Sequence, residues 1–243
     1  MSRNNKNIIK NNLNKITFHK LDWLEWISLF LAGWFFIYPK PYEFLFTTLL
    51  LMPIIGLLLN GISGRPSIAS LIQITKKSKG ADKYDIADFI DAPAWIITLR
   101  VLIDFEFESF YSMIIPGIVS AILILILLFS THSLIMNSNK DKTWIILSIV
   151  TNILIYSFAA TYGANCVYDQ SEAKVYSAKV IDKHISKGRR HTTYYLKVEP
   201  WGHHYDPENI TVTKYQYTET TIGQLVNIDY KKGFFNIPWY FIE

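Results

Sequence analysis

"FYSMIIPGIVSAILILILLFS", residues 110–130, holds no charged side chain over its 21 residues. An α-helix needs about 20 apolar residues to cross the ~30 Å hydrocarbon core of a bilayer. Three more apolar blocks of similar length occupy residues 23–38, 44–62 and 144–163. The sequence therefore predicts an integral membrane protein with four transmembrane helices.

The short connections between these blocks predict two helical hairpins. Between Tyr38 and Tyr42 lie only Pro39, Lys40 and Pro41, and two prolines cannot continue a helix without a break. The first block is followed by no small-residue cleavage site, so we expect it to remain in the protein as a signal anchor. The third and fourth blocks form the second hairpin.

The position of the basic residues predicts the orientation of these hairpins. The chain has a net charge of +4, and most of its loop Lys and Arg residues lie before the first block or between the second and third blocks. These residues are Arg3, Lys6, Lys10, Lys15 and Lys20, and then Arg65, Lys76, Lys77, Lys79, Lys83 and Arg100. The other two connections hold only Lys40, and Lys140 with Lys142. The positive-inside rule then places both termini in the cytoplasm.

Five segments follow from these patterns. Residues 1–22 are expected to form a basic cytoplasmic tail, 23–62 and 110–163 the transmembrane hairpins, 63–109 a cytoplasmic loop, and 164–243 a cytoplasmic β-rich domain. The loop is too long to lack structure of its own. Its residues 81–103 predict a helix that is broken or kinked near Pro93, and their apolar run is short enough to favour a helix lying in the membrane interface.

The last segment has the alternating pattern of short β-strands. "TTYYLKVE" places Tyr194, Leu196 and Val198 on one face, and similar runs occur at residues 173–182, 209–213, 224–230 and 234–242. About five strands within this length predict a small SH3/OB-like barrel. The fold class is therefore an α+β membrane protein with four transmembrane helices, an interfacial helical loop and a C-terminal β-barrel.

"EPWGHHYDP", residues 199–207, lies between the second and third of these strands and resembles a metal site. Zinc needs three or four converging ligands, and at least one would have to come from elsewhere in the chain. The only other imidazoles nearby in sequence belong to His184 and His191. Adjacent histidines in a loop are usually splayed apart and solvated, so we expect no metal and no cofactor here. Trp201 is expected to cover one end of the barrel.

No sequence motif indicates catalysis. The chain has no Ser, His and Asp in a hydrolase order with elbow glycines, no phosphate-binding loop and no HExxH. The single cysteine, Cys166, excludes an internal disulfide and fits a small apolar residue just past the end of a helix. Nucleic acid is not expected as a ligand, because few aromatic residues are placed to stack on bases. We therefore expect a protein that is not an enzyme.

Four basic residues cluster in the turn after the first predicted strand, namely Lys183, Lys187, Arg189 and Arg190. A basic segment close to an anionic leaflet gains about 1 kcal/mol per Lys or Arg, so this hairpin is a candidate for contact with lipid headgroups. An ordinary solvated turn explains the same residues equally well. Both interpretations are kept.

The run from Asn165 to Tyr240 resembles the tail of an uncharacterised family of bacterial polytopic membrane proteins. The resemblance rests on an Asn and an Asp just past the last span, a basic "SKGRR" hairpin, "YYLKVEPWG", "IGQLVNIDYKKG" and a terminal "PWY". It implies a bacterial membrane location and a β-rich tail, and it implies no activity.

The expected function is a binding or scaffolding module at the inner face of the membrane. Its expected partners are the bilayer, anionic headgroups and either a protein partner or a second copy of the chain. The alternative is a small transporter or channel component, for which charged residues facing each other in mid-span are scarce. Asn152, deep in the fourth block, is expected to form a hydrogen bond between helices rather than a transport site.

Overall fold

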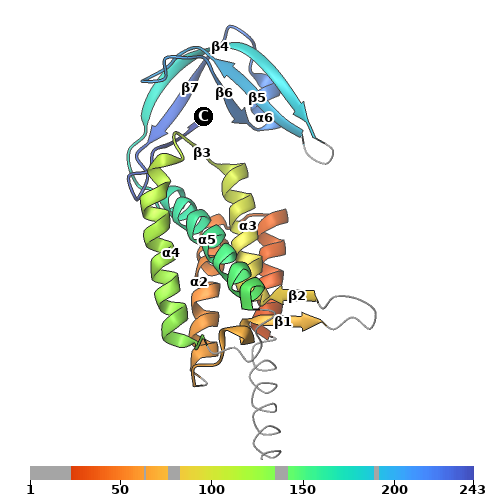
Figure 1. The fold of residues 1–243 in the computed structure, drawn as a ribbon. Helices are drawn as coiled ribbons and strands as arrows, with labels where there is room; N and C mark the ends of the chain where they lie inside the picture. The colour runs from red at the N-terminus through yellow and green to blue at the C-terminus, as the bar shows by residue number, and fades with distance from the viewer. Residues whose placement is uncertain (1–22, 63, 76–82, 135–141, 189–191) are drawn as a thin grey trace, which may run out of the picture. The chain divides into compact units, whose positions relative to one another are not determined.

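The computed structural model describes residues 23–62, 64–75, 83–134, 142–188 and 192–243, and the chain forms two compact units (Figure 1). The first, a helical unit, comprises Met1–Val101 and Ile114–Gly163. The second, a β-rich unit, comprises Leu102–Met113 and Ala164–Glu243. A segment that precedes the third predicted span therefore belongs to the β-rich unit, which the sequence did not indicate.

Three helices are long and apolar enough to cross a membrane. They are α2 (Tyr42–Gly61), α4 (Tyr111–Thr131) and α5 (Lys142–Val167), and the mean hydropathy of their most apolar stretches is 2.0, 2.7 and 1.8. Each coincides with one of the predicted apolar blocks. The first block forms a shorter apolar helix at Trp23–Ile37 within the described residues.

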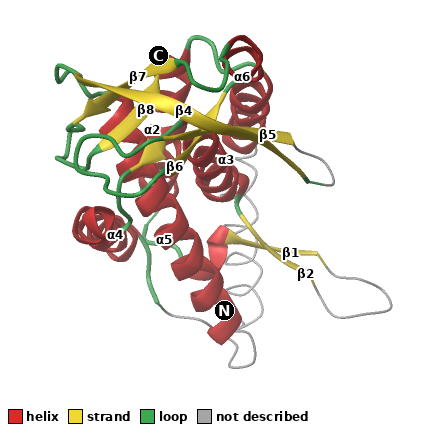
Figure 2. Ribbon diagram, turned by 90° about the horizontal axis from the view of Figure 1, so that it is seen from above, coloured by secondary structure: helices red, strands yellow, loops and turns green. Residues whose placement is uncertain are grey.

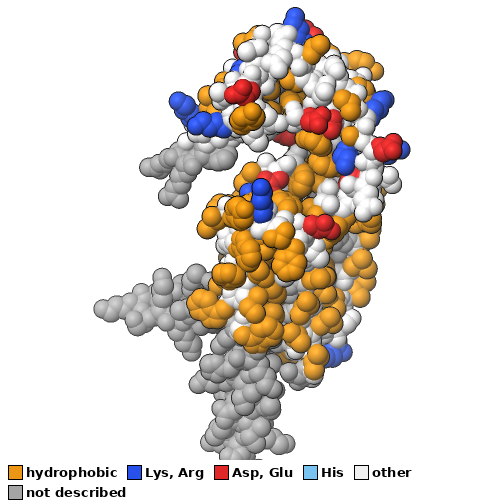
Figure 3. Space-filling model, turned by 180° about the vertical axis from the view of Figure 1, so that it is seen from behind, with side chains coloured by type: hydrophobic (Ala, Val, Ile, Leu, Met, Phe, Trp, Pro, Cys, Tyr) orange, Lys and Arg blue, Asp and Glu red, His pale blue; other side chains and the backbone are white. Residues whose placement is uncertain are grey.

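The helical unit presents a broad apolar surface, which Figure 3 shows as hydrophobic side chains covering the helices. Along α4 the exposed residues are almost all large and aliphatic, including Ile114, Ile115, Ile118, Ile122 and Ile126. Water-soluble proteins seldom leave a continuous apolar patch of this kind uncovered. This surface suits a hydrocarbon environment.

Two glycines leave room for aromatic rings from neighbouring helices. A methyl group on Gly56 of α2 would overlap the ring of Phe89, and one on Gly117 of α4 would lie 2.6 Å from the ring of Phe158. Small residues at such positions let helix backbones approach each other, which is the usual basis of helix association in membranes. The hydroxyl of Tyr156 in α5 adds a hydrogen bond to the carbonyl of Leu50 in α2.

The region between α2 and α4 is organised differently from the predicted interfacial helix. After the short 3-10 helix η1 (Ile68–Leu71), β1 (Ile72–Thr75) and β2 (Lys83–Ile86) pair as an antiparallel hairpin. The helix expected from residue 81 begins only at Asp88 as α3 (Asp88–Asp104), because the residues before it are paired in the hairpin, and it continues through Pro93.

Two polar residues are buried at one end of the helical unit. Asn60 donates a hydrogen bond to Ser70 at 3.2 Å and lies 3.0 Å from Nε2 of His132. Burial lowers the pKa of the His132 imidazole to about 4, so this ring is neutral at pH 7. The predicted interhelical role of Asn152 is wrong: its amide donates to Ser148 of the same helix at 3.1 Å.

The β-rich unit is a nearly closed antiparallel sheet of six strands in the order β3-β8-β7-β4-β5-β6 (Figure 2). Its strands are β3 (Glu106–Phe107), β4 (Lys174–Lys187), β5 (Thr192–Val198), β6 (Glu208–Val212), β7 (Leu225–Lys231) and β8 (Trp239–Ile242). The five strands predicted from alternation are confirmed. The sixth, β3, comes from before α4.

The long strand β4 lets the sheet curl. Its first half pairs with β7 and its second half with β5, and an irregularity between Val180 and Asp182 separates the two halves. Such bulges increase the local twist and bend a strand. The inward-facing residues then meet in one core, which contains Val180, Leu196, Val198, Trp201, Ile210, Ile228 and Tyr240.

The two edge strands, β3 and β6, are linked by a side chain instead of a full ladder. The carboxylate of Glu106 accepts a hydrogen bond from the backbone N–H of Thr211 at 3.3 Å. Next to this seam lies α6 (Lys214–Glu219), a short helix that the sequence analysis did not predict. Thr213 caps it and forms a reciprocal capping box with Gln216.

Candidate functional site

The loop between β5 and β6 makes a tight turn that places two histidine rings together. His204 N donates to Trp201 O at 2.8 Å, and Trp201 N donates to His204 O at 3.2 Å. Gly202 has a φ of +55°, which favours glycine, and packs against the ring of Tyr176. The rings of His203 and His204 lie 4.7 Å apart. The expectation that the two histidines would be splayed apart is wrong, whereas the expected solvent exposure holds for His203.

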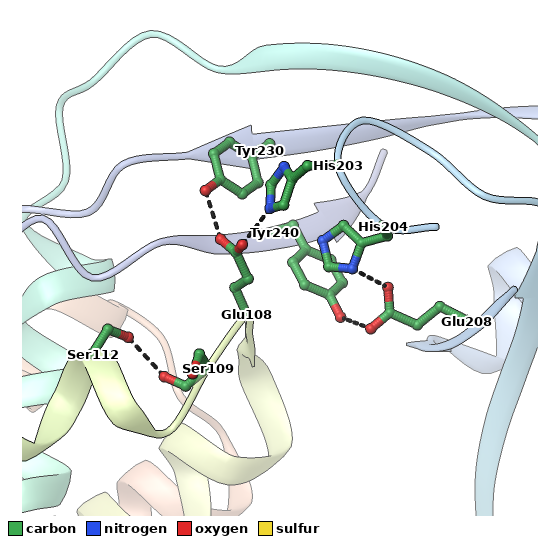
Figure 4. Close-up of polar contacts among 8 residues, drawn as sticks. All are labelled: Glu108, Ser109, Ser112, His203, His204, Glu208, Tyr230 and Tyr240. Atoms are coloured by element: carbon green, nitrogen blue, oxygen red, sulfur yellow. Dashed lines mark hydrogen bonds and ion pairs between the residues drawn. The ribbon is translucent and has the colours of Figure 1, made fainter. Parts of the chain in front are cut away.

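His203 meets a carboxylate from a distant part of the chain. Its Nε2 forms an ion pair and hydrogen bond with Oε1 of Glu108, which directly follows β3 (Figure 4). The other oxygen, Oε2, accepts a hydrogen bond from the hydroxyl of Tyr230 at 2.6 Å. The pairing of β3 with β8 carries Glu108 to this place, and its own N–H donates to Pro238 O at 3.3 Å.

His204 is held from two sides. Its Nδ1 lies 3.2 Å from Oε2 of Glu208, whose other oxygen accepts a hydrogen bond from the Tyr240 hydroxyl at 2.7 Å (Figure 4). Its ring stacks on Trp201 at 4.2 Å, and Trp201 is itself buried in the barrel core. The second nitrogen, Nε2, is buried and has no hydrogen-bond partner among the residues that the structure describes.

The charge state of this cluster follows from its hydrogen bonds. Burial alone would raise the pKa of the Glu108 carboxyl, but the hydrogen bonds from Tyr230 and His203 outweigh it and hold that pKa below its ordinary value. Burial, together with the hydrogen bond to Glu108, raises the pKa of Tyr230, and burial with Glu208 does the same for Tyr240. At neutral pH the site therefore presents the ionised carboxylate of Glu108, whose two oxygens contact the Tyr230 hydroxyl and His203.

Three side chains converge closely enough to share a ligand. One atom each from Glu108, His203 and His204 can be chosen so that all three lie within 4.8 Å of one another. The two histidines were recognisable in the sequence, but Glu108, which is 95 residues from His203, was not. "FEFES" carries no local signal for this role, and only the pairing of β3 with β8 reveals it.

The predicted basic hairpin is partly committed to other contacts. The Nζ of Lys183 donates to the carbonyls of Tyr217 and Thr220, and it lies 4.4 Å from the centre of the Tyr217 ring. Lys183 therefore fastens α6 to the sheet. Lys187 ends β4 and is exposed, whereas Arg189 and Arg190 lie outside the described residues.

Asn165 and Asp169, on which the family resemblance partly rests, hold the turn between β7 and β8. Asn165 lies inside α5 rather than past the last span, where the sequence placed it. Asn165 is fully buried; its Oδ1 accepts from Phe235 N at 2.8 Å, and its Nδ2 donates to Ile237 O at 2.8 Å. Asp169 accepts from Gly233 N at 3.0 Å and from the indole of Trp239 at 2.8 Å. Cys166 lies buried inside α5 rather than past its end. These contacts explain the two polar residues by structure alone.

A cavity of about 870 Å³ opens at the seam of the sheet. Its walls come from the segment before β3, the start of β5, the end of β6 and β8, and they include Phe105, Tyr195, Thr211, Gln216 and Trp239. Both polar and aromatic groups line it, which is the usual mixture in a ligand pocket. The part of the chain that the structure describes thus offers a hollow on the β-rich unit close to unpaired strand edges.

No protein-family model matches the chain, and the searches of curated proteins and of solved structures found no match either. The fold and site therefore define the protein only by class. It is an α+β chain with three helices long and apolar enough to cross a membrane and a nearly closed antiparallel sheet of six strands.

Proposed function

We propose that the protein is an integral membrane protein whose β-rich unit is a non-enzymatic binding or scaffolding module at the inner face of a bacterial cytoplasmic membrane. The observation that supports this most strongly is the exposed apolar surface of the three long helices. In water a surface of this kind favours aggregation, whereas in hydrocarbon it carries no such cost. The β-rich unit differs in having an interior apolar core, although apolar side chains such as those of Ile222, Leu225 and Phe234 also lie on its surface.

A fourth span and the orientation form part of the proposal. The helix at Trp23–Ile37 lies directly after residues 1–22, and the exposed Trp23, Trp26 and Tyr38 near its ends suit the headgroup region. With four spans, the excess of Lys and Arg before the first helix and in the loop after the second places both termini in the cytoplasm. The β-rich unit would then face the cytoplasm.

The cavity at the seam supports a binding role for the β-rich unit. Its size is within the ~300–1,000 Å³ range of small-molecule and peptide pockets. Lys187, which is exposed, and the neighbouring Arg189 and Arg190 would add contact with anionic headgroups. These three residues carry the proposal because Lys183 is engaged with α6.

The alternative of a transporter or channel component receives less support. The cavity among α2, α3, α4 and α5 has a volume of only about 10 Å³ and apolar walls, including Pro53, Leu57, Leu128 and Ile153. A hollow of this size holds one water molecule at most. Asn60 and His132 contact each other, and their remaining polar contacts are with Ser70 and Thr131. Packing at the ends of the helices therefore accounts for both residues without a transported ligand.

The membrane proposal is tested by placing one charge on the exposed apolar surface. Ile122 lies in the middle of α4 and is 50% exposed, so Ile122→Arg would put a guanidinium in the hydrocarbon at a cost of about 2.5–3.5 kcal/mol. We expect a several-fold loss of the fraction that stays membrane-bound after alkaline carbonate extraction. Ile222→Arg is the matched control, because Ile222 is 61% exposed on the β-rich unit and should tolerate the charge. Release of the unchanged protein by carbonate would refute the proposal.

A further inference from the structure

We propose that Glu108, His203 and His204 form a binding site for a divalent transition-metal ion of the zinc class. Two imidazole nitrogens and one carboxylate oxygen are a common donor set for such ions, which take three protein ligands and leave one position to water or substrate. This inference goes beyond the proposed function, and it does not depend on the orientation of the helices in a membrane.

The distances are close to those of a preformed site. Ligand atoms that are each ~2.0–2.2 Å from a tetrahedral zinc ion are about 3.4 Å apart. The three atoms here lie within 4.8 Å of one another, so closure around an ion requires a movement of roughly an ångström. The side chain of His203 is 47% exposed and can make this movement by rotating about its own bonds.

The surroundings of His204 orient it as a ligand. A metal-bound imidazole usually directs its other N–H to a carboxylate, which fixes the tautomer and the angle of the ring. Glu208 lies 3.2 Å from Nδ1 of His204, and the Tyr240 hydroxyl in turn holds Glu208. Among the described residues neither Nε2 of His204 nor Oε2 of Glu208 has a hydrogen-bond partner. With the proton on Nδ1 and directed to this Oε2, the lone pair of Nε2 would be free to bind a metal.

Glu108 is oriented in the same manner. The Tyr230 hydroxyl occupies Oε2 and leaves Oε1 toward the histidines (Figure 4). The carboxylate therefore needs no rearrangement to bind an ion through Oε1, apart from giving up its direct contact with His203.

A plain ion pair explains only part of this arrangement. The contact between His203 and Glu108 could serve as a structural link between β3 and the loop before β6. It does not account for a second imidazole held beside it by a carboxylate and a phenol, with a buried nitrogen left unsatisfied. Among the described residues Nε2 of His204 is a buried polar atom without a hydrogen-bond partner, and a bound ion would give it one.

The test uses the full chain in detergent, without a histidine tag and stripped of metal by a chelator. Zinc is titrated against a chromophoric competitor, and cobalt is added separately to record its visible absorption. We expect one zinc per chain and a cobalt spectrum of tetrahedral intensity. His203→Ala and Glu108→Gln should weaken zinc binding by at least ~10-fold, and Glu208→Gln, which acts through His204, by ~10–100-fold.

His184→Ala is the matched control. His184 is exposed on β4 and stacks on Tyr195, away from the cluster, so its loss should leave both the affinity and the cobalt spectrum unchanged. Melting curves without metal identify any variant that is simply unfolded. His203→Ala is the variant with the lowest risk of unfolding, because the His203 side chain is about half exposed to solvent. Equal zinc binding by the His203→Ala, Glu108→Gln and unchanged proteins would overturn the proposal, as would the absence of stoichiometric zinc binding at micromolar concentrations.

Discussion

Replacing Asn165 by alanine should open the turn between β7 and β8. The Asn165 side chain is fully buried, and it satisfies the N–H of Phe235 and both backbone groups of Ile237. In the variant, the backbone N–H of Phe235 can bond to water because Phe235 is 43% exposed. The backbone groups of Ile237 cannot, because this residue is only 1% exposed. Asn165→Ala therefore leaves two buried polar groups unpaired at about 1–3 kcal/mol each, for a total of about 2–6 kcal/mol.

Limited proteolysis of the full chain measures this loss. Trypsin can cut after Lys231 and Lys232 only when the turn opens, and the cutting rate follows the population of the open form when reclosing is fast. A loss of 2 kcal/mol or more corresponds to at least ~30-fold faster cleavage at these two sites, measured by mass spectrometry.

Asn227→Ala is the control for this experiment. Asn227 lies in the same unit, but it is exposed, and its side chain accepts only the 3.2 Å hydrogen bond from Ser177. Its replacement should cost under ~0.5 kcal/mol and change cleavage by less than ~3-fold. Similar cleavage rates in the two variants would refute the claim that Asn165 holds the turn.

Two further predictions concern charged groups of the β-rich unit. Burial would raise the pKa of the Asp169 carboxyl, but hydrogen bonds from Ser171, Gly233 and Trp239 outweigh it and lower that pKa. The ionised carboxylate therefore stabilises the folded protein fully at pH values above the ordinary pKa near 3.8. This stabilisation disappears as the pH falls through the lower pKa of the folded state. Asp169→Asn should melt several degrees below the unchanged protein at pH 7, and the difference should shrink in scans below about pH 4; a constant difference would contradict this. If the basic hairpin contacts headgroups, tryptic cleavage after Lys187 should be slower in anionic than in zwitterionic proteoliposomes at low salt. Changing Arg189 and Arg190 to glutamine should remove that difference. Equal cleavage rates in the two lipids would show that the hairpin is an ordinary solvated turn.

The long helices and five of the strands could be predicted because their signals are local. An uninterrupted apolar block such as residues 110–130 leaves few alternatives to a helix, and the alternation in "TTYYLKVE" fixes which residues face a core. β5 and β7 occupy nearly the predicted residues, whereas β4 continues to Lys187 beyond the predicted end at residue 182, and β8 covers only Trp239–Ile242 of the predicted run 234–242.

The missed elements are those that depend on distant partners or on very few residues. β3 has two residues and exists only because β8 pairs with it, and β2 forms only because β1 lies opposite. Glu108 reaches His203 through the β3–β8 pairing, so no window of sequence could join them. α6 is different: Thr213 and Gln216 have the spacing of a capping box, and this signal was present in the sequence.

The central claim is that the helices cross the membrane and leave the β-rich unit at its inner face. The most direct measurement is labelling of single cysteines by a membrane-impermeant maleimide in intact and lysed bacterial cells, in a Cys166→Ala background. Tyr215, which is 74% exposed on α6, is replaced by cysteine in one variant, and Ser138, between the last two spans, in another. The account predicts that Ser138→Cys is labelled in intact cells and Tyr215→Cys only after lysis; labelling of Tyr215→Cys in intact cells to the same extent as after lysis would contradict it.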